Sequence, residues 1–109
     1  MGGVGDNGEP TAPGQWGGRA VARTIAAAQA RQKLIVTGTI RGVRVEHVPV
    51  LQLEADLDDG TGRIMLVFLG RAAIGGIEPG RGITIEGTVS ASHGHHVVLN
   101  PLYELEPDS

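Results

Sequence analysis

Arginine is the residue type in this chain best suited to hold a ligand. The sequence contains eight arginines and a single lysine. A guanidinium group donates two parallel hydrogen bonds to a phosphate and also stacks on a planar ring. Four arginines lie in or beside stretches that predict β-strands, and these are the candidate phosphate-binding residues: Arg41, Arg44, Arg63 and Arg71. The alternative for each of them is a solvated side chain at the rim of the fold.

The charges are unevenly distributed along the chain. A formal net charge of −3 argues against a protein that coats nucleic acid, because non-specific affinity comes mainly from neutralising phosphates. Between Trp16 and Val45, however, there are six basic residues and no acidic one, and the acids of the predicted folded region begin at Glu46. This asymmetry permits a basic face on an acidic chain. In the alternative, the two halves neutralise each other across the fold.

Three histidines near the predicted tip of a hairpin are candidates for a metal site or for ligand contacts: His93, His95 and His96. Adjacent histidines in an extended chain point to opposite faces, whereas a structural zinc site needs four convergent ligands. We therefore expect exposed loop histidines and no metal, with His95 as a candidate ligand contact. No serine or threonine has a plausible histidine and acidic partner, so the sequence predicts a binding module without a cofactor, not an enzyme.

Length and composition limit the fold further. A chain of 109 residues has room for one domain with one modest core. Cysteine is absent, which excludes both a disulfide framework and a cysteine-based metal site. No apolar run approaches the roughly 20 residues of a membrane span. We expect a soluble, cytoplasmic protein that contacts no membrane, and the arginine-rich, lysine-poor composition is typical of a high-GC bacterial genome.

Hydrophobic periodicity divides the chain into three parts. Residues 1–18 are rich in glycine and predict a disordered arm, and residues 19–32 predict a short amphipathic helix with a basic outer face. Residues 33–106 predict a β-barrel, in which one helical turn in the glycine-rich connection 70–82, closed by a turn at Pro79-Gly80, follows the third strand. The five expected strands are Leu34–Val45, Val50–Leu57, Arg63–Leu69, Ile83–Ser90 and His96–Leu105. Glycines in the first predict a bend or bulge, and Pro101 predicts lost pairing in the fifth.

The role of Phe68 depends on the register of the second and third strands. A four-residue loop, 58–61, would place Leu51 opposite Phe68 and Asp56 opposite Arg63, which turns the Phe68 ring into the core. A three-residue loop would turn that ring outward, where it could stack on a base. The other aromatic residues are Trp16 in the arm, which either docks or stacks, and Tyr103, which we expect at the end of the barrel.

Several stretches of the chain resemble one family of proteins. They are VTGTIRGV (36–43), LEADLDDGTGRIMLVFLG (53–70), GIEPGRGITIEGTV (76–89) and VVLNPLYEL (97–105). The chain is similar here to small bacterial OB-fold nucleic-acid-binding proteins related to the tRNA anticodon-binding domain and to the wedge domain of branch-migration helicases. The resemblance implies an all-β, five-stranded Greek-key barrel. It also implies that single-stranded nucleic acid binds on the second and third strands, between the loops that join strands one to two and four to five.

These observations lead to two hypotheses. In the first, the chain binds single-stranded DNA or RNA weakly and without evident sequence specificity, through Arg41, Arg44, Arg63, Arg71, Phe68 and His95. Glu54 and Asp56 on the same face oppose phosphate binding. In the second, the barrel is a protein-interaction or oligomerisation module with no nucleic-acid ligand. Neither hypothesis includes a small-molecule substrate.

Overall fold

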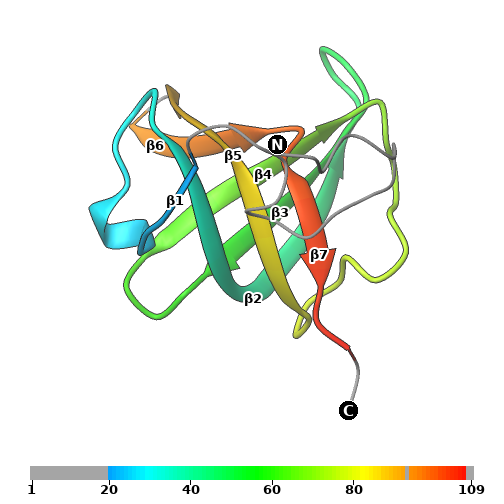
Figure 1. Ribbon diagram of the computed structural model, residues 1–109. Helices are drawn as coiled ribbons and strands as arrows, with labels where there is room; N and C mark the ends of the chain where they lie inside the picture. Colours follow the sequence, from blue (N-terminus) through cyan, green and yellow to red (C-terminus); the bar gives the residue numbers. More distant parts are fainter. Residues whose placement is uncertain (1–19, 93, 108–109) are drawn as a thin grey trace, which may run out of the picture.

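A single sheet of seven strands makes up most of the computed structural model, which describes residues 20–92 and 94–107 (Figure 1). The predicted arm 1–18 lies outside the described residues. The strands are β1 (Val21–Ala22), β2 (Lys33–Glu46), β3 (Gln52–Asp58), β4 (Arg63–Leu69), β5 (Gly82–Ser92), β6 (His95–Leu99) and β7 (Leu102–Leu105). Their order in the sheet is β1-β2-β3-β4-β6-β5-β7, and β2 also pairs with β5. The pairings therefore return to β2 and close on themselves.

The long, bent first strand of the prediction is confirmed as β2. Its first half pairs with β5 and its second half with β3, both antiparallel. The register with β3 shifts between Ile40 and Gly42, which places a bulge at Arg41. Gly38 lies where β2 crosses the end of β3, and a Cβ atom there would meet the carbonyl oxygen of Asp58 at 2.6 Å. Gly38 and Gly42 therefore lie where β2 bends.

The expected fifth strand is divided in two. β6 pairs parallel with β4 and antiparallel with β5, whereas β7 pairs only with β5 among the described strands. The break falls at Asn100, whose φ is 48°, and at Pro101, which has no N–H to donate to a ladder. The predicted loss of pairing at Pro101 is confirmed. This division, together with the two-residue strand β1, gives seven strands where the sequence predicted five.

The loop between β3 and β4 has four residues, but it is 59–62 and not 58–61. Leu53 pairs with Phe68, and Asp58 pairs with Arg63. The predicted register is therefore wrong by two residues, as is the predicted pairing of Asp56 with Arg63. A shift of two residues leaves every side chain on its predicted face, so the expected inward position of Phe68 is confirmed.

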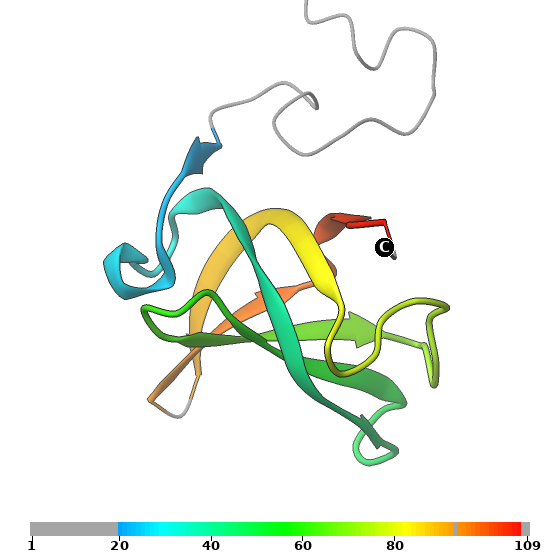
Figure 2. The ribbon, with the colours of Figure 1, turned by 90° about the horizontal axis from the view of Figure 1, so that it is seen from below.

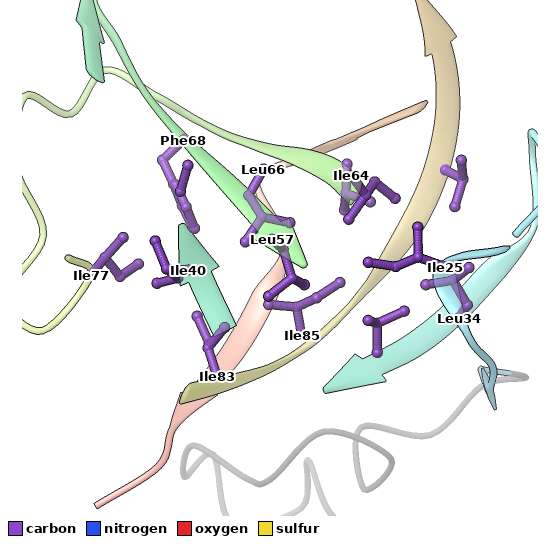
Figure 3. Close-up of a cluster of buried hydrophobic side chains, with 14 of the residues drawn as sticks. Ile25, Leu34, Ile40, Leu57, Ile64, Leu66, Phe68, Ile77, Ile83 and Ile85 are labelled. Atoms are coloured by element: carbon purple, nitrogen blue, oxygen red, sulfur yellow. The ribbon is translucent and has the colours of Figure 1, made fainter. Parts of the chain in front are cut away.

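The core lies inside the closed sheet and consists of aliphatic side chains and one aromatic ring, that of Phe68 (Figure 3). Alternate residues of β3 point inward, because Leu53, Ala55 and Leu57 are at most 1% exposed. Burying each large aliphatic side chain stabilises the fold by about 1.5–3 kcal/mol. The core fixes which residues of β2, β3, β4 and β6 face outward.

The predicted helix over residues 19–32 is wrong in its described part. Only Ile25–Ala27 are helical, as the 3₁₀ helix η2, and β1 precedes them. The segment packs beside the β3–β4 hairpin at one end of the molecule (Figure 2). Ile25 and Ala28 of this segment are buried. Hydrogen bonds from the hairpin replace those of a longer helix, because Asp59 and Thr61 accept from the N–H groups of Ile25 and Ala26.

The connection from β4 to β5 contains β-turns and not the predicted helical turn. Ile77 N–H donates to the Ile74 carbonyl, and Arg81 N–H donates to the Glu78 carbonyl. The second of these is the predicted Pro79-Gly80 turn, in which Gly80 has a φ of 93° that favours glycine. Across residues 20–92 and 94–107, no helix has the length and apolar character to span a membrane.

Candidate nucleic-acid interface

The outward face of β3, β4 and β6 carries charged side chains along one side and apolar side chains along the other. The register places Arg44 of β2 beside Glu54 of β3, then Val67 of β4, then Leu99 of β6. The next row on this face runs from Asp56 through Met65 to Val97. Charged groups therefore line the β2–β3 side, and aliphatic groups form the β4–β6 side.

Two adjoining hollows follow this face and share Met65 and His95. The first, of about 420 Å³, is lined by Arg44, Asp56, Arg63, Ile64, Met65, His95 and His96. The second, of about 540 Å³, is lined by Pro49, Gln52, Glu54, Met65, Val67, Ser92, His95, Val97 and Leu99. We call the two together the groove. The β2–β3 loop contributes Pro49 and the β5–β6 hairpin contributes His95, which are the flanking loops that the resemblance implied.

Each arginine at the groove is paired with a carboxylate. Arg44 Nε lies 2.8 Å from Glu54 Oε1, and its Nη1 lies 3.5 Å from Asp56 Oδ2. Asp58 Oδ2 lies 3.4 Å from Arg63 Nε and 3.7 Å from Arg41 Nε. The guanidinium groups are about half exposed, so solvent screens these pairs and each contributes little to stability. Such exposed pairs can be exchanged for contacts to a ligand.

Asp58 is held in its charged form at the end of the groove. The backbone N–H of Gly60 donates to Asp58 Oδ1 at 2.7 Å. This bond, against the cost of partial burial and together with the positive charges of Arg63 and Arg41, lowers the pKa of Asp58 below its ordinary value of 3.8. A carboxylate that is charged at neutral pH and lies between two arginines keeps both side chains near the hairpin.

The structure brings four of the six predicted site residues together. Arg44, Arg63 and His95 line the groove, and Arg41 shares Asp58 with Arg63. Arg71 is exposed in the loop after β4 and lines neither hollow. Phe68 is 5% exposed and meets the Tyr103 ring edge-on, with the ring centroids 5.8 Å apart. Its ring belongs to the core, which corrects its inclusion in the site.

The apolar floor of the groove was missed at the sequence level. It consists of Met65, Val67, Val97 and Leu99. Val67 is 5% exposed although it lies outside the main core cluster. The signal was in β4, where Met65 and Val67 alternate with core residues and so give an apolar outward face to a strand that would be polar there if it faced only solvent.

Further apolar side chains are exposed near this floor. Val50, Leu69 and Leu99 are between 42% and 51% exposed, and Val48 is 82% exposed. Leu69 N–H donates to Asn100 Oδ1, and the following residue, Gly70, donates to the carbonyl of Leu51. The ends of β4 and β6 and the β2–β3 loop therefore meet here. Exposed apolar groups that gather in one place are typical of interaction sites.

Comparison with known proteins identifies the architecture. No family model matches the chain, and no curated protein matches its sequence. The second OB-fold domain of replication protein A from Methanococcus maripaludis superposes with a TM-score of 0.61 and 11% identity, over 82% of this chain and 98% of that one. This chain has an OB-fold.

Two further solved structures share this OB-fold. A replication protein A heterotrimer bound to ssDNA matches with a TM-score of 0.57 and 15% identity, over 94% of this chain and 74% of that one. The Stn1-Ten1 complex of S. pombe matches with a TM-score of 0.56 and 14% identity, over 70% of this chain and 59% of that one. The resemblance noted in the sequence is thus supported at the level of the fold.

Proposed function

We propose that this OB-fold binds single-stranded nucleic acid in the groove, without marked sequence preference. The observation that carries the proposal is the division of the groove into a cationic side and an apolar floor. Arg44 and Arg63 supply guanidinium groups for phosphates, while Met65 and Leu99 supply aliphatic surface for the faces of bases. The ssDNA-bound replication protein A heterotrimer, which shares this fold, lends support.

A single strand suits this groove better than a duplex. The floor is apolar and can contact a base only where the base face is exposed, whereas stacking in a duplex covers both faces. The described linings of the groove include no phenylalanine, tyrosine or tryptophan. Aliphatic contacts take any base, so we expect little discrimination between sequences and between DNA and RNA.

The carboxylates of the groove make this binding weak. A phosphate that contacts Arg44 displaces Glu54 and Asp56, and one that contacts Arg63 or Arg41 displaces Asp58. Each exchange replaces one charge-assisted contact with another, so the net gain is small. The release of counterions from the strand remains the main favourable electrostatic contribution, and it is largest at low salt.

A second candidate function is a protein-interaction module. The exposed apolar residues in and beside the groove favour it: Leu99 of the floor and, beside it, Val48, Val50 and Leu69. An apolar surface contacts a protein without counterion release, so the two functions respond differently to salt. A partner protein held there would leave Arg41 and Arg63 free for a nucleic acid.

The test is binding of a labelled single-stranded oligonucleotide, measured by fluorescence anisotropy across a range of salt concentrations. We expect binding in low salt, tighter than for a duplex of equal length, with a log–log salt slope on the order of −2 for three phosphate contacts on a single strand. The double variant Arg41→Gln/Arg44→Gln should weaken binding of oligonucleotides of every sequence alike and flatten this slope by about 1.4. Arg71→Gln, which removes one such charge outside the groove, is the control for each of the two substitutions.

Absence of binding in low salt by a folded protein would contradict the nucleic-acid proposal and leave the protein-interaction function. Equal affinity for single strand and duplex would contradict the role of the apolar floor.

A further inference from the structure

A third hollow, of about 590 Å³, shares no lining residue with the groove. Arg23 and Thr24 of the N-terminal segment form one wall, and Ile35 and Thr37 of β2 form the other. Asp59, the neighbour of Asp58, closes one end. Arg23, Thr24 and Thr37 thus line one open depression, where the Thr37 hydroxyl also lies 2.8 Å from the Thr84 hydroxyl and shares a hydrogen bond with it.

Arg23 is held in place by its own backbone. Its N–H donates to the carbonyl of Ile35 at 3.0 Å, directly after the parallel pairing of β1 with β2. Thr24 then caps η2, because its side-chain oxygen accepts from Ala27 N–H. The backbone that carries the Arg23 side chain is therefore fixed against β2 before any ligand arrives.

The Arg23 charge differs from those of the groove. Within residues 20–92 and 94–107, no ion pair joins Arg23 to a carboxylate, whereas Arg41, Arg44 and Arg63 are all paired. Asp59 is committed elsewhere: it accepts from Ile25 N–H at 2.8 Å, from Thr61 N–H at 2.9 Å and from Thr61 Oγ1 at 2.6 Å. An anion at Arg23 therefore has no carboxylate to displace.

The outward face of β2 connects this hollow with the groove. Leu34, Val36 and Ile40 are buried, so the residues between them point outward. Outward positions in order are Ile35, Thr37, Thr39, Arg41 and, beyond the bulge, Arg44. At about 3.3 Å per residue, Thr37 and Arg44 are at most about 23 Å apart along the strand. The outward face of β2 carries no acidic side chain between Lys33 and Val45.

We propose that a nucleic-acid strand leaving the groove follows the outward face of β2, and that Arg23, with Thr24 and Thr37, binds one of its phosphates. This inference rests on the proposed function and extends the site from the groove to a longer footprint. It predicts that Arg23 matters only for strands long enough to reach it. The groove residues matter for strands of every length.

The experiment compares a short and a long oligothymidylate, of about 4 and about 16 nucleotides, which are the two ends of the range of site sizes for OB-folds. Arg23→Gln should weaken binding of the long strand about threefold or more and lower its log–log salt slope by about 0.7, the value for one lost phosphate contact on a single strand. Binding of the short strand should not change. Unaltered thermal unfolding of Arg23→Gln shows that η2 remains docked.

Two further variants sharpen the comparison. Thr39→Arg adds a cation on the same outward face, opposite Asp58, and should tighten binding of the long strand more than that of the short strand. Arg71→Gln, at the opposite end of β4, should leave the ratio of the two affinities unchanged. If Arg23→Gln and Thr39→Arg both leave that ratio at the wild-type value while both strands bind, the longer footprint is wrong and the groove alone is the site. If neither strand binds the wild-type protein, the proposed function fails as well.

Discussion

The backbone N–H of Ile25 donates to Oδ2 of Asp59 at 2.8 Å, across 34 positions of sequence. Ala26 N–H donates to Thr61 Oγ1 at 3.0 Å in the same way. The Ile25 side chain is buried beside Gly62, where an added Cβ would lie 3.2 Å from Ile25 Cγ2. The β3–β4 hairpin therefore accepts the first two N–H groups of η2, beside the Thr24 cap, and it joins the segment that carries Arg23 to the strands of the groove.

Removal of the Asp59 carboxylate, which accepts from the Ile25 N–H, should destabilise the protein. Asp59→Ala leaves the Ile25 N–H without its acceptor, and an unsatisfied group of this kind costs about 1–3 kcal/mol of unfolding free energy. Urea denaturation followed by circular dichroism measures the change. Glu104→Ala, at an exposed carboxylate of β7, should change the free energy by less than about 0.5 kcal/mol. Equal stabilities for the two variants would mean that the contact contributes nothing.

The same carboxylate predicts a pH dependence of stability. Partial burial disfavours the charge of Asp59, but the hydrogen bonds from Thr61, Ile25 and Gly62 outweigh that cost and lower its pKa below 3.8. A carboxyl group whose pKa is lower in the folded than in the unfolded chain stabilises the fold fully above the unfolded pKa. That stabilisation is lost as the pH falls below 3.8 through the folded pKa.

Thermal unfolding of the wild type and of Asp59→Asn between pH 7 and pH 2 tests this dependence. The wild type should be the more stable at pH 7, and the difference should shrink as the pH falls below the ordinary value of 3.8. A difference in melting temperature that stays constant down to pH 2 would contradict the assignment to the Asp59 charge.

The sequence pattern predicted the strands well because the alternation of apolar and polar residues indicates which residues face the core. β4 has the predicted bounds, and the bend at Gly38 and the break at Pro101 follow from backbone restrictions that are local. The prediction of a helix over residues 19–32 was wrong because N–H groups of this segment donate to residues that are distant in the sequence. Asp59 and Thr61 lie more than 30 residues away from the N–H groups that they accept from, and the periodicity of residues 19–32 contains no sign of them.

The candidate site was predicted less completely than the fold. Arginines could be chosen by type and strand, but their partners depend on a register that alternation fixes only to the nearest two residues. Arg63 consequently lies beside Asp58 and not beside Asp56. The apolar floor at Met65 and Val97 arises from the parallel pairing of β4 with β6, two strands separated by the whole of β5, so only the fold brings it together.

The facing of β3 can be tested by a pair of neighbouring substitutions. Leu53 is 1% exposed in the core, and Leu53→Ala should lower the free energy of unfolding by about 2–5 kcal/mol. The Glu54 side chain is 12% exposed on the outer face beside Arg44, and Glu54→Ala should change it by about 1 kcal/mol or less. The reversed order of these two effects would show that the strand faces the other way.

A similar pair on β4 separates the core from the groove. Phe68→Ala should destabilise the protein by about 3–5 kcal/mol, because its ring fills the core against Tyr103. Met65→Ala should leave unfolding nearly unchanged and weaken binding of an oligonucleotide, because Met65 belongs to the floor of both hollows. Thermal unfolding and anisotropy on the same samples distinguish the two. Full affinity in Met65→Ala would remove the floor from the site.

The carboxylates of the groove lead to a prediction of tighter binding. Glu54 Oε1 accepts from Arg44 Nε at 2.8 Å, and Glu54 Oε2 accepts from Gln52 Nε2 at 2.7 Å. Glu54→Gln removes the charge that competes with a phosphate for Arg44 and keeps the size of the side chain. Affinity for a single strand in low salt should rise, and the log–log salt slope should steepen as Arg44 becomes fully available.

The charge-matched control is Glu104→Gln, which changes the net charge equally on β7 and should alter affinity only slightly. If the two variants bind equally well, general charge repulsion and not the Arg44 pair limits binding. If Glu54→Gln binds more weakly than the wild type, Glu54 positions Arg44 for its phosphate instead of competing for it. In an Arg44→Gln background the effect of Glu54→Gln should disappear, because both of these roles act through Arg44. An effect of Glu54→Gln that persists there would come from general charge repulsion.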